Sequence, residues 1–172
     1  MLSPFAPLRH GAFRLLWTAN LAGNIGLWVQ NTAAAWMMTS IAPSATMVSM
    51  VQVMGLLPVV LLGLPAGALA DILDRRHVLI GAQAWILAMA VLLALLTAGE
   101  AMGPWMLLAL TFAIGMGNAL NFPAWAATTP DLVPRDDLVQ AIALNGIGFN
   151  LARSVGPAIG GFVIAPSGLG SA

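Results

Sequence analysis

Arg153 stands out chemically because it is a charged residue in the middle of a long apolar segment. An arginine at the centre of a membrane-spanning helix costs about 3 kcal/mol on insertion scales, and it normally faces a bundle interior or a wet cavity with a partner. About 15 residues separate Arg153 from the polar start of its segment, which is too deep for the side chain to reach the membrane surface. The position therefore favours a residue that lines a pathway over one that reaches back to water.

A seam of small residues follows Arg153 in the same segment. Gly156, Gly160 and Gly161 leave a groove that a neighbouring helix can enter. Pro157 removes one backbone hydrogen bond and bends the helix. A charge beside such a flexible seam predicts a helix that moves during the working cycle of the protein.

Amide and indole side chains form a second candidate site. They recur at helical spacing in one apolar segment and so share one face of it: Trp17, Asn20, Asn24, Trp28 and Asn31. A later segment repeats the pattern with Asn118, Asn121 and Trp125. In lipid such groups need partners or water, so both faces should point into the bundle, where they suit a bulky amphipathic organic molecule. The alternative is that the amides only hold helices together, each contributing about 0.6 kcal/mol.

A third cluster lies at the end of another apolar segment. Gly63 and Gly67 form a GxxxG pair, which lets a neighbouring helix approach closely. Asp71 follows at the C-terminal end of the predicted helix, where the macrodipole disfavours an anion unless a cation is near. Arg75 and Arg76 are within reach to supply that cation. A conformational latch built from Gly67, Asp71, Arg75 and Arg76 and a simple basic anchor in a tight turn both remain open.

The composition requires a membrane protein. Of 172 residues, 60% are hydrophobic and only 7% are charged, too few to build a water-exposed surface. Six arginines balance six acids, so there is no basic surface for nucleic acid. The absence of cysteine and the presence of only two histidines exclude a disulfide framework, a thiolate or histidine-rich metal site and a cysteine nucleophile. No HExxH, GxSxG or P-loop motif occurs, so we expect no catalytic residues, no cofactor and no ATP-driven pump.

Charged residues divide the chain into five predicted membrane spans. Residues 15–70 carry no charge and are long enough for two spans joined by a turn at Thr39–Ser44, where Pro43 cannot continue a helix. The spans are expected at about 15–38, 46–70, 78–98, 104–128 and 138–164. Residues 1–14 precede them and 165–172 form a truncated outer loop. Because the arginines outside the spans all precede spans one, three and five, the N-terminus is predicted to be cytoplasmic.

Several of these residues resemble motifs of the major facilitator superfamily of secondary transporters. Residues 67–76 resemble its loop motif between helices two and three, with Ile72 and Asp74 in place of a basic residue and a glycine. Residues 156–161 resemble its fifth-helix antiporter motif, with Ala152 in place of a further glycine. A narrower similarity to the branch of enterobactin exporters and macrolide efflux proteins is carried by Phe122-Pro123-Ala124, residues 132–138, Asn145 and Ala152-Arg153.

The resemblance implies a fold and a function. The superfamily has two six-helix halves, with the substrate site between them. The chain is therefore expected to be an all-α, polytopic helical bundle, an incomplete N-terminal half with about five transmembrane helices. It is expected to export a bulky amphipathic molecule, a siderophore or a drug, by proton-coupled alternating access in the bacterial inner membrane. Its expected partners are the lipid bilayer, a small-molecule substrate and the missing C-terminal half of the same transporter.

The alternative is a non-transporting membrane scaffold that binds a partner subunit through its glycine-rich faces. The length leaves both functions open. Five spans cannot form a cavity between two halves, so the sequence looks like the front part of a longer transporter.

Overall fold

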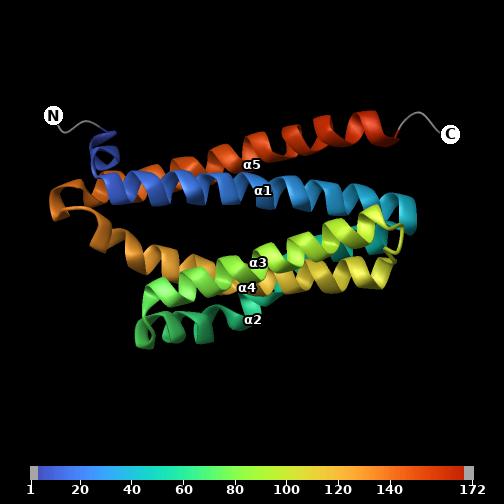
Figure 1. The fold of residues 1–172 in the computed structure, drawn as a ribbon, viewed down its shortest axis with the longest axis horizontal. Helices are drawn as coiled ribbons and strands as arrows, with labels where there is room; N and C mark the ends of the chain where they lie inside the picture. The colour runs from blue at the N-terminus through green and yellow to red at the C-terminus, as the bar shows by residue number, and fades with distance from the viewer. Residues whose placement is uncertain (1–3, 169–172) are drawn as a thin grey trace. The chain divides into compact units, whose positions relative to one another are not determined.

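Helices make up nearly all of the structure (Figure 1). The computed structural model describes residues 4–168, apart from the side chains of residues 70, 71 and 164–168. The elements are, in order, η1 (Ala6–Arg9), α1 (Gly11–Ile41), α2 (Ala45–Ile72), α3 (Arg75–Ala98), α4 (Pro104–Leu132), η2 (Arg135–Asp137) and α5 (Leu138–Gly168). No strand occurs in residues 4–168, and the all-α class expected from the sequence is confirmed.

Short breaks separate the long helices. Pro43 lies in the break between α1 and α2, but the turn predicted at 39–44 is too long, because Thr39–Ile41 continue α1 up to the residues next to the proline. Between α2 and α3 the side chain of Asp74 accepts a hydrogen bond of 2.9 Å from the backbone N–H of Arg76, which caps α3. Each predicted span lies within one of these helices, which continue up to about one turn further.

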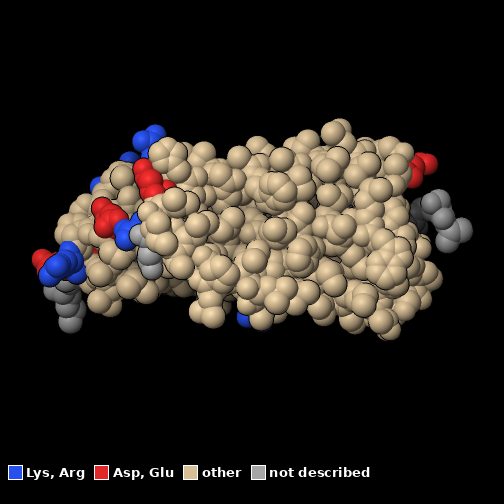
Figure 2. Space-filling model, turned by 90° about the horizontal axis from the view of Figure 1, so that it is seen from below, with Lys and Arg blue, Asp and Glu red and all other residues tan. Residues whose placement is uncertain are grey.

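Three helices are long and apolar enough to cross a membrane, judged by length and composition over the described residues: Ala45–Leu69, Arg75–Ala98 and Pro104–Asp131. The amides and glycines of α1 and α5 lower the mean hydropathy of these two helices. Large apolar side chains remain on the surface, and Leu64 is 89% exposed and Phe162 83% exposed. Figure 2 shows a long uncharged surface between charged helix ends, with one basic side chain within it. Such a surface is stable against lipid and would be an association site in water.

The chain divides into two compact units. The first comprises Met1–Ala33 and Thr128–Ala172, and the second Ala34–Ala127. In the first unit, α1 and α5 lie side by side (Figure 1), with a core of Phe13, Val133, Ala141 and Leu144. Trp17 of α1 lies beside Gly148 of α5, and Thr32 lies beside Gly160. Because the residue numbers increase in the same direction along both helices, α1 and α5 run parallel.

In the second unit, α4 packs between α2 and α3. A Cβ at Gly115 would lie 2.7 Å from the Gly55 carbonyl oxygen of α2, and a Cβ at Gly117 would lie 3.1 Å from Cδ1 of Trp85 on α3. In the most apolar stretch of α4, 50% of the residues are buried, against 11% in the corresponding stretches of α2 and α3. The absence of side chains at these two glycines thus allows both neighbouring helices to approach α4.

Candidate functional site

The contact between α1 and α5 is built from small residues of α5 at four-residue spacing. Gly148, Ala152, Gly156 and Gly160 are all buried and lie on one face of the helix. Ala152 stands where the superfamily motif has a glycine, and its side chain is fully buried. α1 packs against this face of α5.

Gly156 is the closest point of this contact. A Cβ at Gly156 would overlap the Cβ of Trp28 and would lie 3.2 Å from the Ile25 carbonyl oxygen. At Gly160 the corresponding distances are 3.2 Å to the Thr32 Cβ and 3.3 Å to the Val29 carbonyl oxygen. Gly161, by contrast, has no described atom within 4 Å of its Cβ position. Two of the three motif glycines thus contact α1, and the third lies in open space.

Arg153 and Trp28 meet at this seam. The guanidinium carbon of Arg153 lies 5.8 Å from the centroid of the Trp28 ring, within the range of a cation–π interaction. The ring of Phe149 packs against the same indole edge-on, with centroids 6.2 Å apart and planes at 68°. Arg153 is itself exposed. The sequence placed Arg153 and Trp28 in different candidate sites, and the structure brings them together.

Pro157 places a second polar group at Arg153. Because proline has no backbone N–H, the Arg153 carbonyl lacks its usual helical donor four residues further on, although α5 continues through Pro157. A carbonyl without its usual helical donor and a cation therefore lie on the same residue of a predicted span. Nearby polar side chains bond within their own helix: Ser154 Oγ donates to the Asn150 carbonyl at 3.0 Å.

The amides of α1 lie in the first unit, on the face that also carries Trp28. Asn24 donates from Nδ2 to the Asn20 carbonyl at 2.9 Å. The sequence spacing also assigned Trp17 to this face. In the structure Trp17 donates from Nε1 to the Leu144 carbonyl of α5 at 3.2 Å. Gln30 was missed by the sequence reasoning. Both polar atoms of its amide are buried without a hydrogen-bond partner among the described residues.

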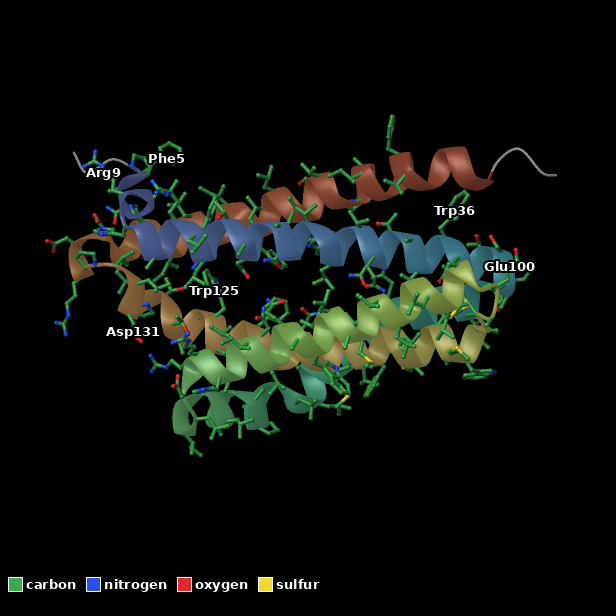
Figure 3. All side chains as sticks on the ribbon, in the orientation of Figure 1. Phe5, Arg9, Trp36, Glu100, Trp125 and Asp131 are labelled. Carbon is green, nitrogen blue, oxygen red and sulfur yellow. The ribbon has the colours of Figure 1, made fainter. Side chains whose placement is uncertain are left out.

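The amides of α4 lie in the second unit. Asn118 is buried and donates from Nδ2 to the Ile114 carbonyl of its own helix at 3.2 Å. Asn121 is 7% exposed, and its Oδ1 accepts a hydrogen bond of 3.2 Å from Gln83 of α3. Trp125 lies near the C-terminal end of α4, whereas Trp36 and Glu100 lie at the opposite end of this unit (Figure 3). The contact of Asn121 is the interhelical type that the alternative to cavity lining describes.

The loop cluster differs in part from the sequence pattern. Asp71 lies in the last turn of α2, and its side chain is outside the described residues. Arg75 donates from Nη1 to the Ala127 carbonyl of α4 at 2.9 Å, which joins the start of α3 to α4. Arg76 is exposed. Gly67 has no described atom within 4 Å of its Cβ position, and no close helix approach occurs there within the described part of the chain.

Further polar contacts fix the end of the first unit that carries Phe5, Arg9 and Asp131 (Figure 3). His10 Nε2 lies 2.9 Å from Oδ2 of Asp137, which connects the segment before α1 to η2. Asn145 donates from Nδ2 to Oγ1 of Thr129 at 3.1 Å. His10 and Asp137 are 127 residues apart in the sequence, and no local signal predicts either pair. Over the same described residues, no three metal-binding side chains come together.

Fold and site together define a polytopic helical membrane protein with glycine-lined helix contacts and an arginine within a predicted span. Over residues 2–172 the chain matches the major facilitator family described as transmembrane secretion effectors, and it belongs to that family. The resemblance recognised in the sequence is confirmed. Proteins of this family are transporters, which are not enzymes.

Curated relatives are bacterial. The chain is 28% identical over 147 residues to macrolide efflux protein A of Streptococcus pyogenes, covering 86% of this chain and 36% of that protein. It is 28% identical over 142 residues to the staphyloferrin A transporter of Staphylococcus aureus, covering 82% of this chain and 36% of that protein. It is 30% identical over 115 residues to macrolide efflux protein A of Enterococcus faecalis, covering 67% of this chain and 36% of that protein. The chain thus spans about a third of the length of these relatives, and no solved structure matches it.

Proposed function

We propose that the chain is part of a secondary active exporter that moves a bulky amphipathic organic molecule across the bacterial inner membrane by alternating access. Membership of the transmembrane secretion effector family supports export. Relatives named as macrolide efflux proteins and as a staphyloferrin A transporter support a drug or a siderophore as the cargo. The remainder of the cavity would come from the C-terminal half of the same transporter.

The observation that carries this proposal is the α1–α5 seam. Gly156 and Gly160 hold the two helices at backbone contact, and Arg153 lies beside them over Trp28. Small-residue contacts of this kind let helices slide or rotate without moving bulky side chains past each other. In this mechanism the seam belongs to the moving core.

The loop between α2 and α3 is proposed as the conformational latch. The bond from Arg75 to the Ala127 carbonyl joins the start of α3 to the last turns of α4. With Gly67, Asp71 and Arg76, this bond would stabilise one facing state. The N-terminus is proposed to be cytoplasmic, because the arginines outside the spans precede the odd-numbered helices. Proton exchange is the proposed energy source, because residues 156–161 resemble an antiporter motif.

Efflux measured on cells that produce the protein tests this function. The test compares wild type with Arg153→Ala at matched amounts of protein in the membrane, using a macrolide antibiotic and staphyloferrin A as cargo. We expect wild-type cells to export at least one cargo, a protonophore to stop that export, and Arg153→Ala to abolish it with normal insertion. Unchanged efflux in Arg153→Ala would count against the proposal.

A scaffold is the second candidate function, and the open positions of Gly63 and Gly67 favour it. A partner helix could pack against this pair as GxxxG pairs do. Because the chain has no cysteine, Gly63→Cys gives a single cross-linking site. A specific cross-link to a second protein, in cells that export neither cargo, would favour the scaffold over the exporter.

A further inference from the structure

Arg153 has no carboxylate partner within the described chain. Arg153 contacts the Trp28 ring and is exposed on α5. The acids of the sequence all lie at helix ends or in connections: Asp71, Asp74, Glu100, Asp131, Asp136 and Asp137. None lies in the interior of a long helix, so no span of this chain supplies a negative charge at the depth of Arg153.

Two side chains at this site, Arg153 and Trp28, carry hydrogen-bond donors for which the described residues supply no acceptor. A tryptophan ring attracts a cation through its face but accepts none of the five guanidinium N–H groups as a carboxylate does. The indole N–H of Trp28 is also buried without a hydrogen-bond acceptor in the described residues. Buried or membrane-embedded donors are normally satisfied. An anion with several acceptor oxygens is the ligand that this surplus of donors fits.

The surroundings of the guanidinium are otherwise apolar. Phe149 packs against the same indole and lies one turn before Arg153 on α5, and Pro157 lies one turn after it. On α1, Asn31 lies about one turn beyond Trp28 and on the same face. A small inorganic anion would leave these apolar side chains without contacts. An organic anion would place its charged group on Arg153 and its apolar body along the helices.

We propose that Arg153 and Trp28 form a binding site for the carboxylate of an organic anion with an apolar body, and that this anion is the cargo. The identity of the anion as cargo rests on the proposed export function. Arg153 makes charge-assisted, bidentate hydrogen bonds to the carboxylate, and the Trp28 ring holds the guanidinium in place while the site is empty. The site therefore selects for charge, and a neutral analogue of the same shape binds more weakly.

Fluorine NMR on the purified protein in lipid nanodiscs tests the site directly. The protein is labelled with 5-fluorotryptophan, and Trp28→Phe identifies the Trp28 signal among those of the six tryptophans. The probes are 1-naphthoate and its neutral counterpart 1-naphthamide. We expect the Trp28 signal to shift saturably with naphthoate and to require about ten times more naphthamide, because hydrogen bonds to a charged group are the stronger ones.

Three variants separate binding from packing. Arg153→Gln should remove the preference for naphthoate, and Arg153→Lys should keep part of it because the charge remains. Arg135→Gln is the matched control, since it removes an exposed arginine outside the five long helices and should leave the preference unchanged.

The outcomes are distinct. Equal responses to both probes, or a preference that survives in Arg153→Gln, would overturn the site. The site would also be overturned if the Trp28 signal did not respond to naphthoate and Arg153→Gln destabilised the protein. That result would assign Arg153 to a fixed ion pair with a carboxylate of another protein segment. Export without a naphthoate response refutes the anion site alone. A naphthoate response without export refutes the proposed function and leaves the site standing.

Discussion

Replacing Gly156 with alanine is expected to destabilise the contact between α1 and α5. The added Cβ overlaps the Cβ of Trp28 and lies 3.2 Å from the Ile25 carbonyl oxygen and 3.4 Å from the Trp28 carbonyl carbon. These atoms belong to the α1 backbone or are attached to it, so no rotamer change can relieve the overlap and the helix itself must shift. Overpacking of this kind costs about 1–3 kcal/mol.

Two other glycines of α5 provide a graded control. At Gly160 the nearest atoms are 3.2 and 3.3 Å from the Cβ position, so a shift of a few tenths of an ångström suffices and the loss should be smaller. At Gly146 no described atom lies within 4 Å, and alanine should be neutral or should stabilise the helix by up to about 1 kcal/mol. The expected order of stability is Gly146→Ala, wild type, Gly160→Ala and then Gly156→Ala.

The measurement is the Tm of the purified protein in one detergent, followed by fluorescence-detected gel filtration. With about 2–4 °C per kcal/mol for a chain of this size, Gly156→Ala should lower the Tm by about 2–12 °C. Equal Tm values for Gly156→Ala and Gly146→Ala would refute the packing argument. So would a larger loss at Gly160 than at Gly156.

Two further predictions concern the second unit and the orientation. Gln83→Leu should leave Oδ1 of the buried Asn121 without its donor and lower the free energy of unfolding by about 0.6 kcal/mol, the average for such interhelical bonds. Adding Asn121→Leu to Gln83→Leu should recover part of that loss. If nothing is recovered, the two side chains are not directly bonded. In the cysteine-free chain, Ser44→Cys should react with a membrane-impermeant maleimide on intact cells, and His77→Cys only after the cells are opened. The reverse labelling pattern would overturn the predicted orientation.

The helices could be predicted closely from the sequence because their signals are local. The charge-free run of residues 15–70, Pro43 and the arginines at 75 and 76 identify where apolar segments begin and end. The break at 99–103 is as predicted, whereas the breaks after the first and second spans are shorter than predicted. A helix does not stop where the hydrocarbon stops, and its backbone hydrogen bonds continue until proline or a cap intervenes, as at Asp74.

The candidate site was predictable only in its residue types. Spacing places Trp17 and Trp28 on one face of α1, yet Trp17 bonds to the Leu144 carbonyl whereas Trp28 lies beneath Arg153. Arg75 was expected within reach of Asp71, whose side chain lies outside the described residues, and the bond of Arg75 to the Ala127 carbonyl has no signature in the sequence. A periodic pattern gives the face of a helix, but the identity of the neighbour on that face depends on how two helices rotate against each other.

The sequence by itself determined the membrane class, the helices, the placement of a cation within an apolar segment and the glycines that allow close contact. These properties follow from composition, from the positions of charges and from residue types that recur every three or four residues, all of which can be read over short stretches of sequence. Only the tertiary structure decided that Gly156 meets Trp28 and that Arg153 therefore lies over an aromatic ring rather than beside a carboxylate. The partners come from opposite ends of the chain, and packing alone, through the fit of one helix backbone against another, selects which of them meet.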